Sequence, residues 1–241
     1  VVPEGYGTLA EKAAEGLPIR LSMPVTAIHW DGPGVRVETA SGTISARAVI
    51  VTVPVGVLKK GSIRFVPRLP VFTQKALDGL SMGALTKIGL SIDPKLFPFE
   101  AEGGFSDMTD GSAMTAQMMP FGRPLILCSI GGDRARALCE AGEASAVDHA
   151  THRVVAALGS DARKGIGAGK LAGWWTDPFS LGGYSVAKPG QFVQRDNLSR
   201  PVGGRIWFAG EANAGAASVT AGGAALSAMA AVKEIAARIK A

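Results

Sequence analysis

The sequence contains few cysteine, histidine and aromatic residues. Its 241 residues include 2 Cys and 3 His, and aromatic residues make up 6%. Cys128 and Cys139 provide neither a disulfide framework nor the spacing of a zinc site, and Cys128, in an apolar run, is interpreted as a buried strand thiol. His149 and His152 lie on one predicted helix without a Cys or Glu cluster, so we expect no metal. Because the third histidine, His29, precedes a turn and no G-x-S-x-G segment occurs, a hydrolase triad has no support.

Long apolar runs and basic stripes are also missing. Glu211 and Asn213 interrupt the small-residue stretch 209–232, so no transmembrane helix is expected. No secretory leader is visible, which favours a soluble protein, with the cytoplasm as the expected compartment although no residue specifies it. The net charge of +5 comes from scattered Lys and Arg residues, which makes a nucleic acid an unexpected partner.

No G-x-G-x-x-G dinucleotide-binding segment follows an early strand. The glycine-rich stretch 165–170 fails the spacing of a phosphate-binding loop and precedes a predicted strand, so we interpret it as a flexible surface turn. The chain begins Val1-Val2-Pro3, which indicates an interior point of a longer protein or a cleavage boundary.

The chain does contain strands and helices in the order typical of an α/β protein. The apolar run 48–53 predicts a strand buried on both faces. The helix predicted at 143–158 has an inner stripe of Ala144, Val147, Val154, Val155 and Leu158. Further helices are predicted at 8–15, 73–80 and 221–239, and extended segments at 19–28, 35–39, 44–47, 85–92, 114–119, 125–130, 171–175 and 205–209.

Near the C-terminus, the strand 205–209 is followed by Gly210-Glu211, a small-residue loop and a helix from Ala221. This order resembles a nucleotide-facing βα turn, in which a helix N-terminus supplies free N–H groups and a positive dipole end. Lys87 stands in an otherwise apolar strand. A buried lysine needs a partner or a role, but the strand periodicity favours an outward-facing lysine. Tyr184 follows two glycines, and a turn-flanking aromatic residue is its simpler interpretation.

Taken together, five segments resemble the flavin-containing amine oxidases, a family that includes monoamine oxidases, polyamine oxidases and histone demethylases. The segments follow the order of that family and span nearly the whole chain. They are residues 24–28 (PVTAI), 49–70 (beginning VIVTVPVGVL), 82–87 (MGALTK), 174–185 (beginning WWTDP and ending GGYS) and 207–224 (beginning WFAGE).

The resemblance implies FAD, bound non-covalently, because the segment around Tyr184 has no cysteine for a thioether. It also implies two catalytic positions, in which Lys87 holds a water hydrogen-bonded to flavin N5 and Tyr184 forms one wall of an aromatic cage. Thr220 stands where monoamine oxidases have the second cage tyrosine, so the cage is expected to be one-sided.

The same resemblance implies the cofactor contacts. Val25 would meet the adenine, and Glu211 would lie near the ribose and pyrophosphate. Val219 and Thr220 would offer backbone N–H groups to the pyrimidine end of the flavin. The remaining cofactor-binding positions that the resemblance assigns are Pro54, Trp175, Gly210 and Ser218.

We therefore predict an α/β fold in which a partial, Rossmann-like FAD-binding domain of the glutathione-reductase type (residues 1–57 and 178–241) is interleaved with a mixed-sheet α+β substrate domain (58–177). The predicted activity is oxidation of an amine to an imine, with oxygen reduced to hydrogen peroxide. The expected partners are a small-molecule amine and an N-terminal half or companion chain that carries G-x-G-x-x-G. Assembly into a homo-oligomer is left open by the sequence. The alternatives are a non-catalytic fragment or subunit of a flavoprotein, and a related desaturase or protoporphyrinogen-type oxidase.

Overall fold

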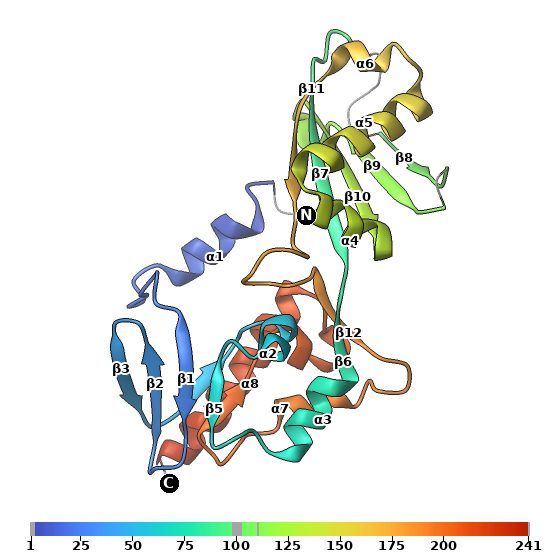
Figure 1. Ribbon diagram of the computed structural model, residues 1–241. Helices are drawn as coiled ribbons and strands as arrows, with labels where there is room; N and C mark the ends of the chain where they lie inside the picture. The colour runs from blue at the N-terminus through green and yellow to red at the C-terminus, as the bar shows by residue number, and fades with distance from the viewer. Residues whose placement is uncertain (1–2, 98–102, 110, 241) are drawn as a thin grey trace.

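The computed structural model describes residues 3–97, 103–109 and 111–240. In these ranges the chain forms two lobes (Figure 1), called the upper and lower lobes from their places in that view. Two segments join the lobes: the strand pair β6 (Leu80–Gly83) and β7 (Leu85–Ile92), and the return from β11 (Ile166–Ala172) to β12 (Tyr184–Ala187). The chain therefore passes from the lower lobe to the upper lobe and back once.

The upper lobe is an antiparallel sheet with the strand order β11-β7-β10-β9-β8. Along β7, the side chains of Thr86, Ile88, Leu90 and Ile92 are buried, whereas Lys87 on the other face is exposed. This alternation is expected for a sheet that is packed on one face only. The other elements of the upper lobe are β8 (Gly104–Asp107), β9 (Met114–Met118), β10 (Leu125–Gly131), α4 (Gly132–Ala141), α5 (Glu143–Leu158), α6 (Ala162–Gly165) and the 3₁₀ turn η1 (Pro120–Gly122).

The glycine-rich stretch before residue 171 was predicted wrongly as a flexible turn. It forms most of β11, which pairs with β7 at the edge of the sheet. The glycines allow close packing, because a Cβ on Gly169 would lie 2.6 Å from a Val147 methyl group. The strand predicted at 171–175 correspondingly ends at Ala172.

The inner face of α5 also differs from the predicted stripe. Ala146, Ala150 and Val154 are fully buried, but Ala144 is exposed. The inner face also includes Arg153, which was not in the predicted stripe; it is 6% exposed and donates to Asp107 Oδ2 at 2.5 Å. A buried ion pair can turn a charged position inward, and apolar periodicity alone does not detect it.

The lower lobe combines three small sheets. One has the order β3-β2-β1-β5, with β1 parallel to β5; in the others, β4 runs parallel to β13 and β12 runs antiparallel to β6. The strands are β1 (Val25–His29), β2 (Val35–Thr39), β3 (Gly42–Ala46), β4 (Val49–Val51), β5 (Arg64–Val66) and β13 (Ile206–Phe208). The helices are α1 (Tyr6–Ala14), α2 (Val55–Lys60), α3 (Val71–Gly79), α7 (Gln194–Ser199) and α8 (Ala221–Lys240), with 3₁₀ turns η2 (Glu211–Asn213) and η3 (Gly215–Ala217).

Two main apolar cores correspond to the two lobes. The upper core is drawn from residues 84–162, with Trp175 packed against it. The lower core combines Leu69, Ala76 and Leu80 with residues from 28–55 and 198–212. The buried cores thus divide between Leu80 and Ala84, whereas the domain boundary at 57 and 58 remains a prediction from sequence.

The described helices include none that is both long and apolar enough to cross a lipid bilayer. The twenty-residue α8 approaches the required length, but it is rich in alanine and glycine and carries charged residues in its second half.

Candidate active site

The carboxyl ends of the parallel strands β4 and β13 lie side by side. Pro54 follows the first strand, and Gly210 and Glu211 follow the second. Together they line a hollow of about 80 Å³ with neighbouring residues of both segments. In α/β proteins, ligands bind outside the carboxyl ends of parallel strands. The structure thus brings Pro54 close to Gly210 and Glu211, which lie far from it in the sequence.

Glu211 joins three segments at this place. Its Oε1 atom accepts the Ser185 N–H at 2.9 Å, and its Oε2 atom accepts the Ser185 hydroxyl at 2.7 Å. Oε2 also accepts the Val219 N–H at 3.2 Å. An ionised carboxylate has about four acceptor positions, and the described chain fills three of them. The Glu211 side chain is thereby a junction between η2, strand β12 and the turn before α8.

Arg195 and Ser185, which were not predicted as site residues from the sequence, form the next layer of this junction. Arg195 is 3% exposed. Its Nη1 atom donates to the Ser185 hydroxyl at 2.6 Å and to the Ala212 carbonyl at 3.2 Å, and its Nη2 atom donates to the Ser185 carbonyl at 3.0 Å. Ser185 lies within a matched segment but was not selected. Arg195 stands in a polar stretch with no motif, so the sequence contained no signal for it.

The turn before α8 has an unusual backbone. Val219 has φ of 61°, a left-handed conformation that β-branched residues seldom adopt, and its side chain is 48% exposed. Thr220 caps the helix, because its hydroxyl accepts the Gly223 N–H at 2.9 Å and donates to the Ala217 carbonyl at 2.8 Å. Ser218 precedes this turn directly. Strained backbone held by its surroundings is typical of functional sites.

Tyr184 and Lys87 lie on the two strands that connect the lobes. Tyr184 stands opposite Gly83, which precedes β7. A Cβ on Gly83 would lie 3.0 Å from the Tyr184 ring, so glycine permits this close approach. Lys87 projects from the sheet face opposite the upper core, beside Ser129 and Ala172 of the neighbouring strands. The outward-facing interpretation of Lys87 therefore describes its place in the structure.

Two selected residues have other surroundings. Val25 is half-buried at the start of β1. Trp175 donates its indole N–H to Glu140 Oε1 at 3.2 Å, and the Arg136 guanidinium lies 4.7 Å from its ring centroid. Both of these partners belong to α4, so Trp175 packs against the upper lobe. The cofactor contacts predicted for Val25 and Trp175 remain predictions.

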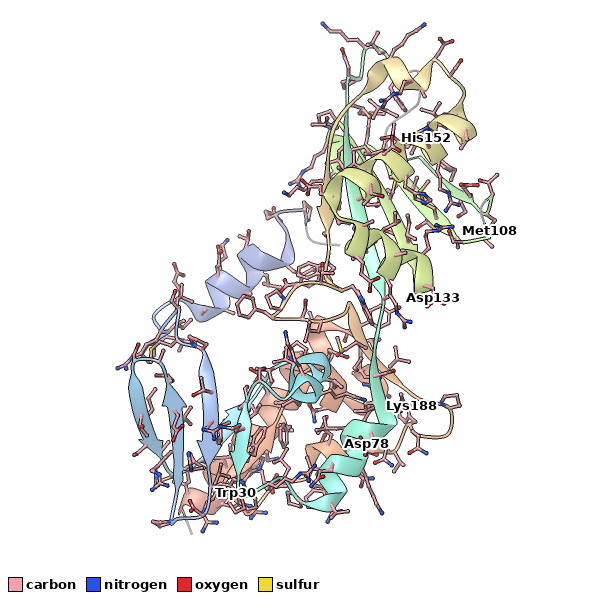
Figure 2. The ribbon with its side chains drawn as sticks, viewed as in Figure 1. Trp30, Asp78, Met108, Asp133, His152 and Lys188 are labelled. Carbon is pink, nitrogen blue, oxygen red and sulfur yellow. The ribbon has the colours of Figure 1, made fainter. Side chains whose placement is uncertain are left out.

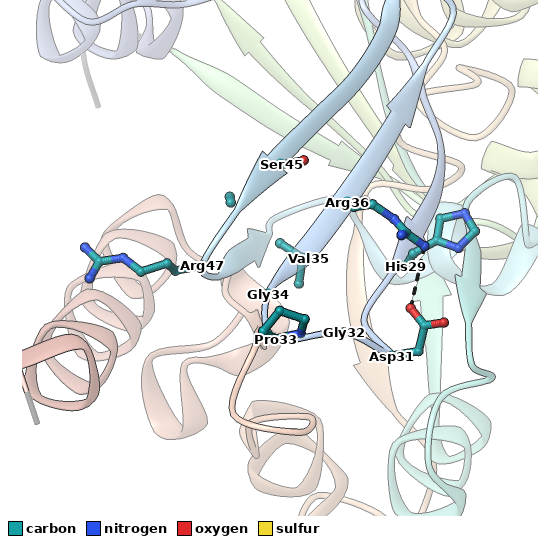
Figure 3. A pocket seen from close by; sticks show the side chains of 10 residues that line it. His29, Asp31, Gly32, Pro33, Gly34, Val35, Arg36, Ser45 and Arg47 are labelled. Carbon is teal, nitrogen blue, oxygen red and sulfur yellow. Dashed lines mark ion pairs between the residues drawn. The ribbon is translucent and has the colours of Figure 1, made fainter.

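A larger hollow lies elsewhere, between the β1–β2 turn and the end of β3 (Figure 3). It measures about 530 Å³ and is lined by His29, Asp31, Arg36 and Arg47 among others. The Arg36–Asp31 pair, at 3.7 Å, is more than half exposed on both sides. None of the predicted site residues lines this hollow, and exposed pairs of this kind contribute little. We therefore place the site at Glu211.

The residues around Glu211 fit one edge of a flavin. The N-terminus of α8 presents its positive dipole end behind an exposed turn, which suits an electron-rich ring edge. One acceptor position of the Glu211 carboxylate remains for a hydroxyl donor. Among the residues that the structure describes, no group of three or more His, Cys, Asp or Glu side chains is arranged to hold a metal.

Comparison with known proteins gives the class. The chain matches the flavin containing amine oxidoreductases over residues 1–236. Rice polyamine oxidase 4 is 33% identical over 244 residues, covering 98% of this chain and 48% of the relative. Rice lysine-specific histone demethylase 1 homolog 1 is 31% identical over 226 residues, covering 88% of this chain and 26% of the relative.

A solved putrescine oxidase, a variant redesigned in cofactor binding, superposes with a TM-score of 0.77 at 18% identity, covering 96% of this chain and 52% of its own. That likeness shows the mixed α/β fold. This chain belongs to the flavin containing amine oxidoreductase family, and it spans between about a quarter and a half of the length of these relatives. The predicted family and its non-covalent FAD cofactor are confirmed.

Proposed function

We propose that this chain forms the flavin-edge and substrate-facing part of an FAD-dependent amine oxidase, in the interleaved domain arrangement predicted from its sequence. The proposed reaction removes a hydride from the carbon beside an amine nitrogen, and water then hydrolyses the imine. FAD, when bound, accepts the hydride and passes the electrons to oxygen, which becomes hydrogen peroxide. The observation that carries this proposal is the junction at Glu211, which links the Tyr184 strand to the turn before α8.

The turn before α8 would contact the electron-rich pyrimidine edge of the flavin ring. The pyrimidine end of a bound flavin would be the part of the ring that gains negative charge on reduction. A helix N-terminus directed at that position stabilises the charge without having to reorganise. Within the chain, the Val219 N–H is bound by Glu211 and the Gly223 N–H by the Thr220 hydroxyl. The N–H groups between these two positions, that of Thr220 included, would therefore act toward the ring.

Tyr184 and Lys87 would act on the substrate side. The Tyr184 face attracts a cationic amine and excludes water from the approach to the reacting carbon. Lys87 would hold the water expected beside flavin N5, where it can donate or receive a proton. Its exposed position on the open face of the upper sheet leaves its ammonium group accessible from that side.

Exposed apolar side chains support a companion surface. On α8, Leu226, Met229 and Val232 are 60%, 68% and 55% exposed, and on α1 Tyr6 and Leu9 are 59% and 53% exposed. Their rows at helical spacing suit packing against another unit. We propose that the occupant is a segment or chain that carries G-x-G-x-x-G and holds the ADP part of FAD. A second copy of this chain is the alternative occupant.

The relatives suggest two substrate classes for a screen. The names of polyamine oxidase 4 and of the putrescine oxidase indicate aliphatic diamines and polyamines. The name of the lysine-specific histone demethylase indicates a lysine side chain in a protein. The alternative function, a non-catalytic part of a flavoprotein, predicts no turnover with either class. The desaturase and protoporphyrinogen-type oxidase alternative is less favoured, because it assigns no role to Lys87.

A visible spectrum with an intact mass is the first test. We expect flavin bands from the protein purified with its companion and release of FAD on denaturation, because the flavin is held non-covalently. In a peroxide-coupled screen, Lys87→Met should slow flavin reoxidation about a hundredfold, the usual scale for a lost proton-transfer group. Lys170→Met is the control, since Lys170 lies on the adjacent strand and is exposed. An unchanged reoxidation rate in Lys87→Met would contradict the lysine–water role.

A further inference from the structure

Arg195 is a buried cation whose hydrogen bonds go to neutral acceptors. It is 3% exposed, and its two terminal nitrogens bind the Ser185 hydroxyl, the Ser185 carbonyl and the Ala212 carbonyl. Within the described part of the chain its Nε atom has no hydrogen-bond partner. Burying a guanidinium is costly unless a carboxylate compensates it. The nearest link to a carboxylate passes through Ser185.

The direction of that link is fixed by chemistry. A guanidinium only donates, and an ionised carboxylate only accepts. The Ser185 hydroxyl, 2.6 Å from Arg195 and 2.7 Å from Glu211, therefore accepts from the arginine and donates to the glutamate. Hydrogen bonds arranged in such a chain polarise and strengthen one another. Ser185 is fully buried, so water does not compete for this hydroxyl.

The far end of the chain is the strained turn. Glu211 Oε2, which accepts from Ser185, also accepts the Val219 N–H at 3.2 Å. Val219 occupies a conformation that it would seldom adopt alone. At the near end, the Ser185 N–H and carbonyl are both bound, which fixes β12 immediately after Tyr184. One connected set of bonds thus holds both the Tyr184 strand and the turn before α8.

We infer that Arg195 is a positioning residue, which acts through Ser185 and Glu211 to set the Tyr184 strand and the Val219 turn relative to each other. The functional importance of this relative position rests on the proposed function, in which the Tyr184 strand faces the amine and the Val219 turn faces the flavin edge. Arg195 itself touches neither Tyr184 nor Val219 by any hydrogen bond recorded in the described chain. Its effect on the turn is therefore indirect.

Hydrogen exchange followed by mass spectrometry tests the inference on the full chain together with whatever companion it purifies with. Ser185→Ala removes the relay hydroxyl but keeps the backbone. We expect exchange across residues 217–220 to become about tenfold faster, the effect of one lost hydrogen bond on a local opening. Arg195→Lys, which keeps the charge but loses the planar fork, should speed exchange in the same segment. Residues 143–158 in the upper lobe should exchange at the wild-type rate.

Arg200→Met is the matched control. Arg200 lies five residues after Arg195, is exposed, and stacks over Phe72 with its guanidinium carbon 4.3 Å from the ring centroid. We expect exchange at 217–220 to be unchanged in this variant. If residues 217–220 of Ser185→Ala exchange at the same rate as in the wild type, the inference is overturned, whatever the rate in Arg195→Lys. Equal exchange there in Arg195→Lys and Arg200→Met would also overturn it.

A flavin readout separates this inference from the proposed function. If the wild-type protein carries FAD, Ser185→Ala should retain flavin but change its visible circular dichroism, because the turn against the ring shifts. An unchanged dichroism spectrum with full flavin content would count against the inference. If the wild-type protein purified with its companion carries no flavin, the proposed function fails, and the exchange experiment still decides whether the relay holds the turn.

Discussion

The upper and lower lobes differ in how completely they cover their apolar side chains. In the upper lobe, Ile88 and Leu90 of the interior strand β7 are fully buried in a core that includes residues of α4 and α5. In the lower lobe, α1 has no buried residue among those described, and α8 leaves Met229 68% exposed. The upper lobe packs its helices on one face of its sheet around one core, whereas the lower lobe, which contains the candidate site, leaves large apolar side chains of α1 and α8 exposed.

The lobes also differ in the use of buried charge. In the upper lobe, Arg153 binds Asp107 and the Ser112 carbonyl, which fastens the loop after β8 to α5; Met108 and His152 mark this region in Figure 2. In the lower lobe, Arg195 reaches Glu211 only through a serine. A direct ion pair suits a structural clamp, and a relay suits elements that must stay aligned around a ligand. The predictions below test this contrast.

The largest effect is expected from breaking the upper clamp. Arg153→Met would remove the arginine that pairs with the Asp107 carboxylate, whose side chain is 12% exposed, and leave that carboxylate bound by Thr109. Removing one member of a buried pair costs about 3–5 kcal/mol. We expect the free energy of unfolding in urea to fall by that amount. Arg163→Met, at an exposed arginine of α6, should stay within about 0.5 kcal/mol of the wild type; a similar loss in both variants would refute the clamp.

Acidification should release the same clamp. Hydrogen bonds from Arg153 and Thr109 lower the pKa of Asp107 from 3.8 to about 2. A lowered folded-state pKa contributes stability that is complete above the unfolded value near 4 and is lost as the pH falls toward 2. We expect the stability difference between wild type and Asp107→Asn to shrink over that window in urea titrations. Asp133→Asn, at a 95% exposed side chain, is the control and should track the wild type.

A methyl group on β11 tests the packing that glycine allows. Gly169→Ala would place a Cβ 2.6 Å from Val147 and 3.0 Å from Leu90. Overpacking of this kind costs about 1–3 kcal/mol, measurable as a lower melting temperature. Gly89→Ala on the adjacent strand meets nothing within 4 Å, and we expect no loss there. Equal melting temperatures for the two variants would show that α5 does not pack on β11 as described.

The smallest effect on stability is expected at the exposed face of α8. Met229→Glu should change the free energy of unfolding by about 0.5 kcal/mol or less, because the side chain is already in water. It should nevertheless weaken binding to the proposed companion, the unit expected to carry G-x-G-x-x-G, measured by co-purification. Met108→Glu, at a side chain 66% exposed in the upper lobe, should leave binding intact. Unchanged co-purification of Met229→Glu would remove α8 from the companion surface.

Much of the fold could be predicted from local patterns. Alternating and continuous apolar runs located β2 and β7 at their observed bounds, and apolar periodicity located α5. The short helix α2, the helix α4 and the polar helix α7 were missed. They are held by packing on neighbouring strands and helices, and short helices have weak propensity signals of their own.

The candidate site was predicted only in part. Pro54, Gly210 and Glu211 were selected from the resemblance, and the structure brings them together where two parallel strands end. Glu211 was assigned to the cofactor, which stays a prediction, and the contacts that the structure gives it are with Ser185 and Val219 of the chain itself. Such contacts join residues that are distant in sequence, so no local pattern marks them.

The sequence by itself determined the family, the flavin and many of the strands and longer helices, β2, β7 and α5 among them, because these depend on local apolar periodicity and on motifs of neighbouring residues. Only the tertiary structure decided that β11 is a strand, that Arg153 turns inward, and that Arg195 reaches Glu211 through Ser185. The physical reason is that a polar or glycine residue is buried according to the partner it meets in space. The sequence alone does not identify that partner.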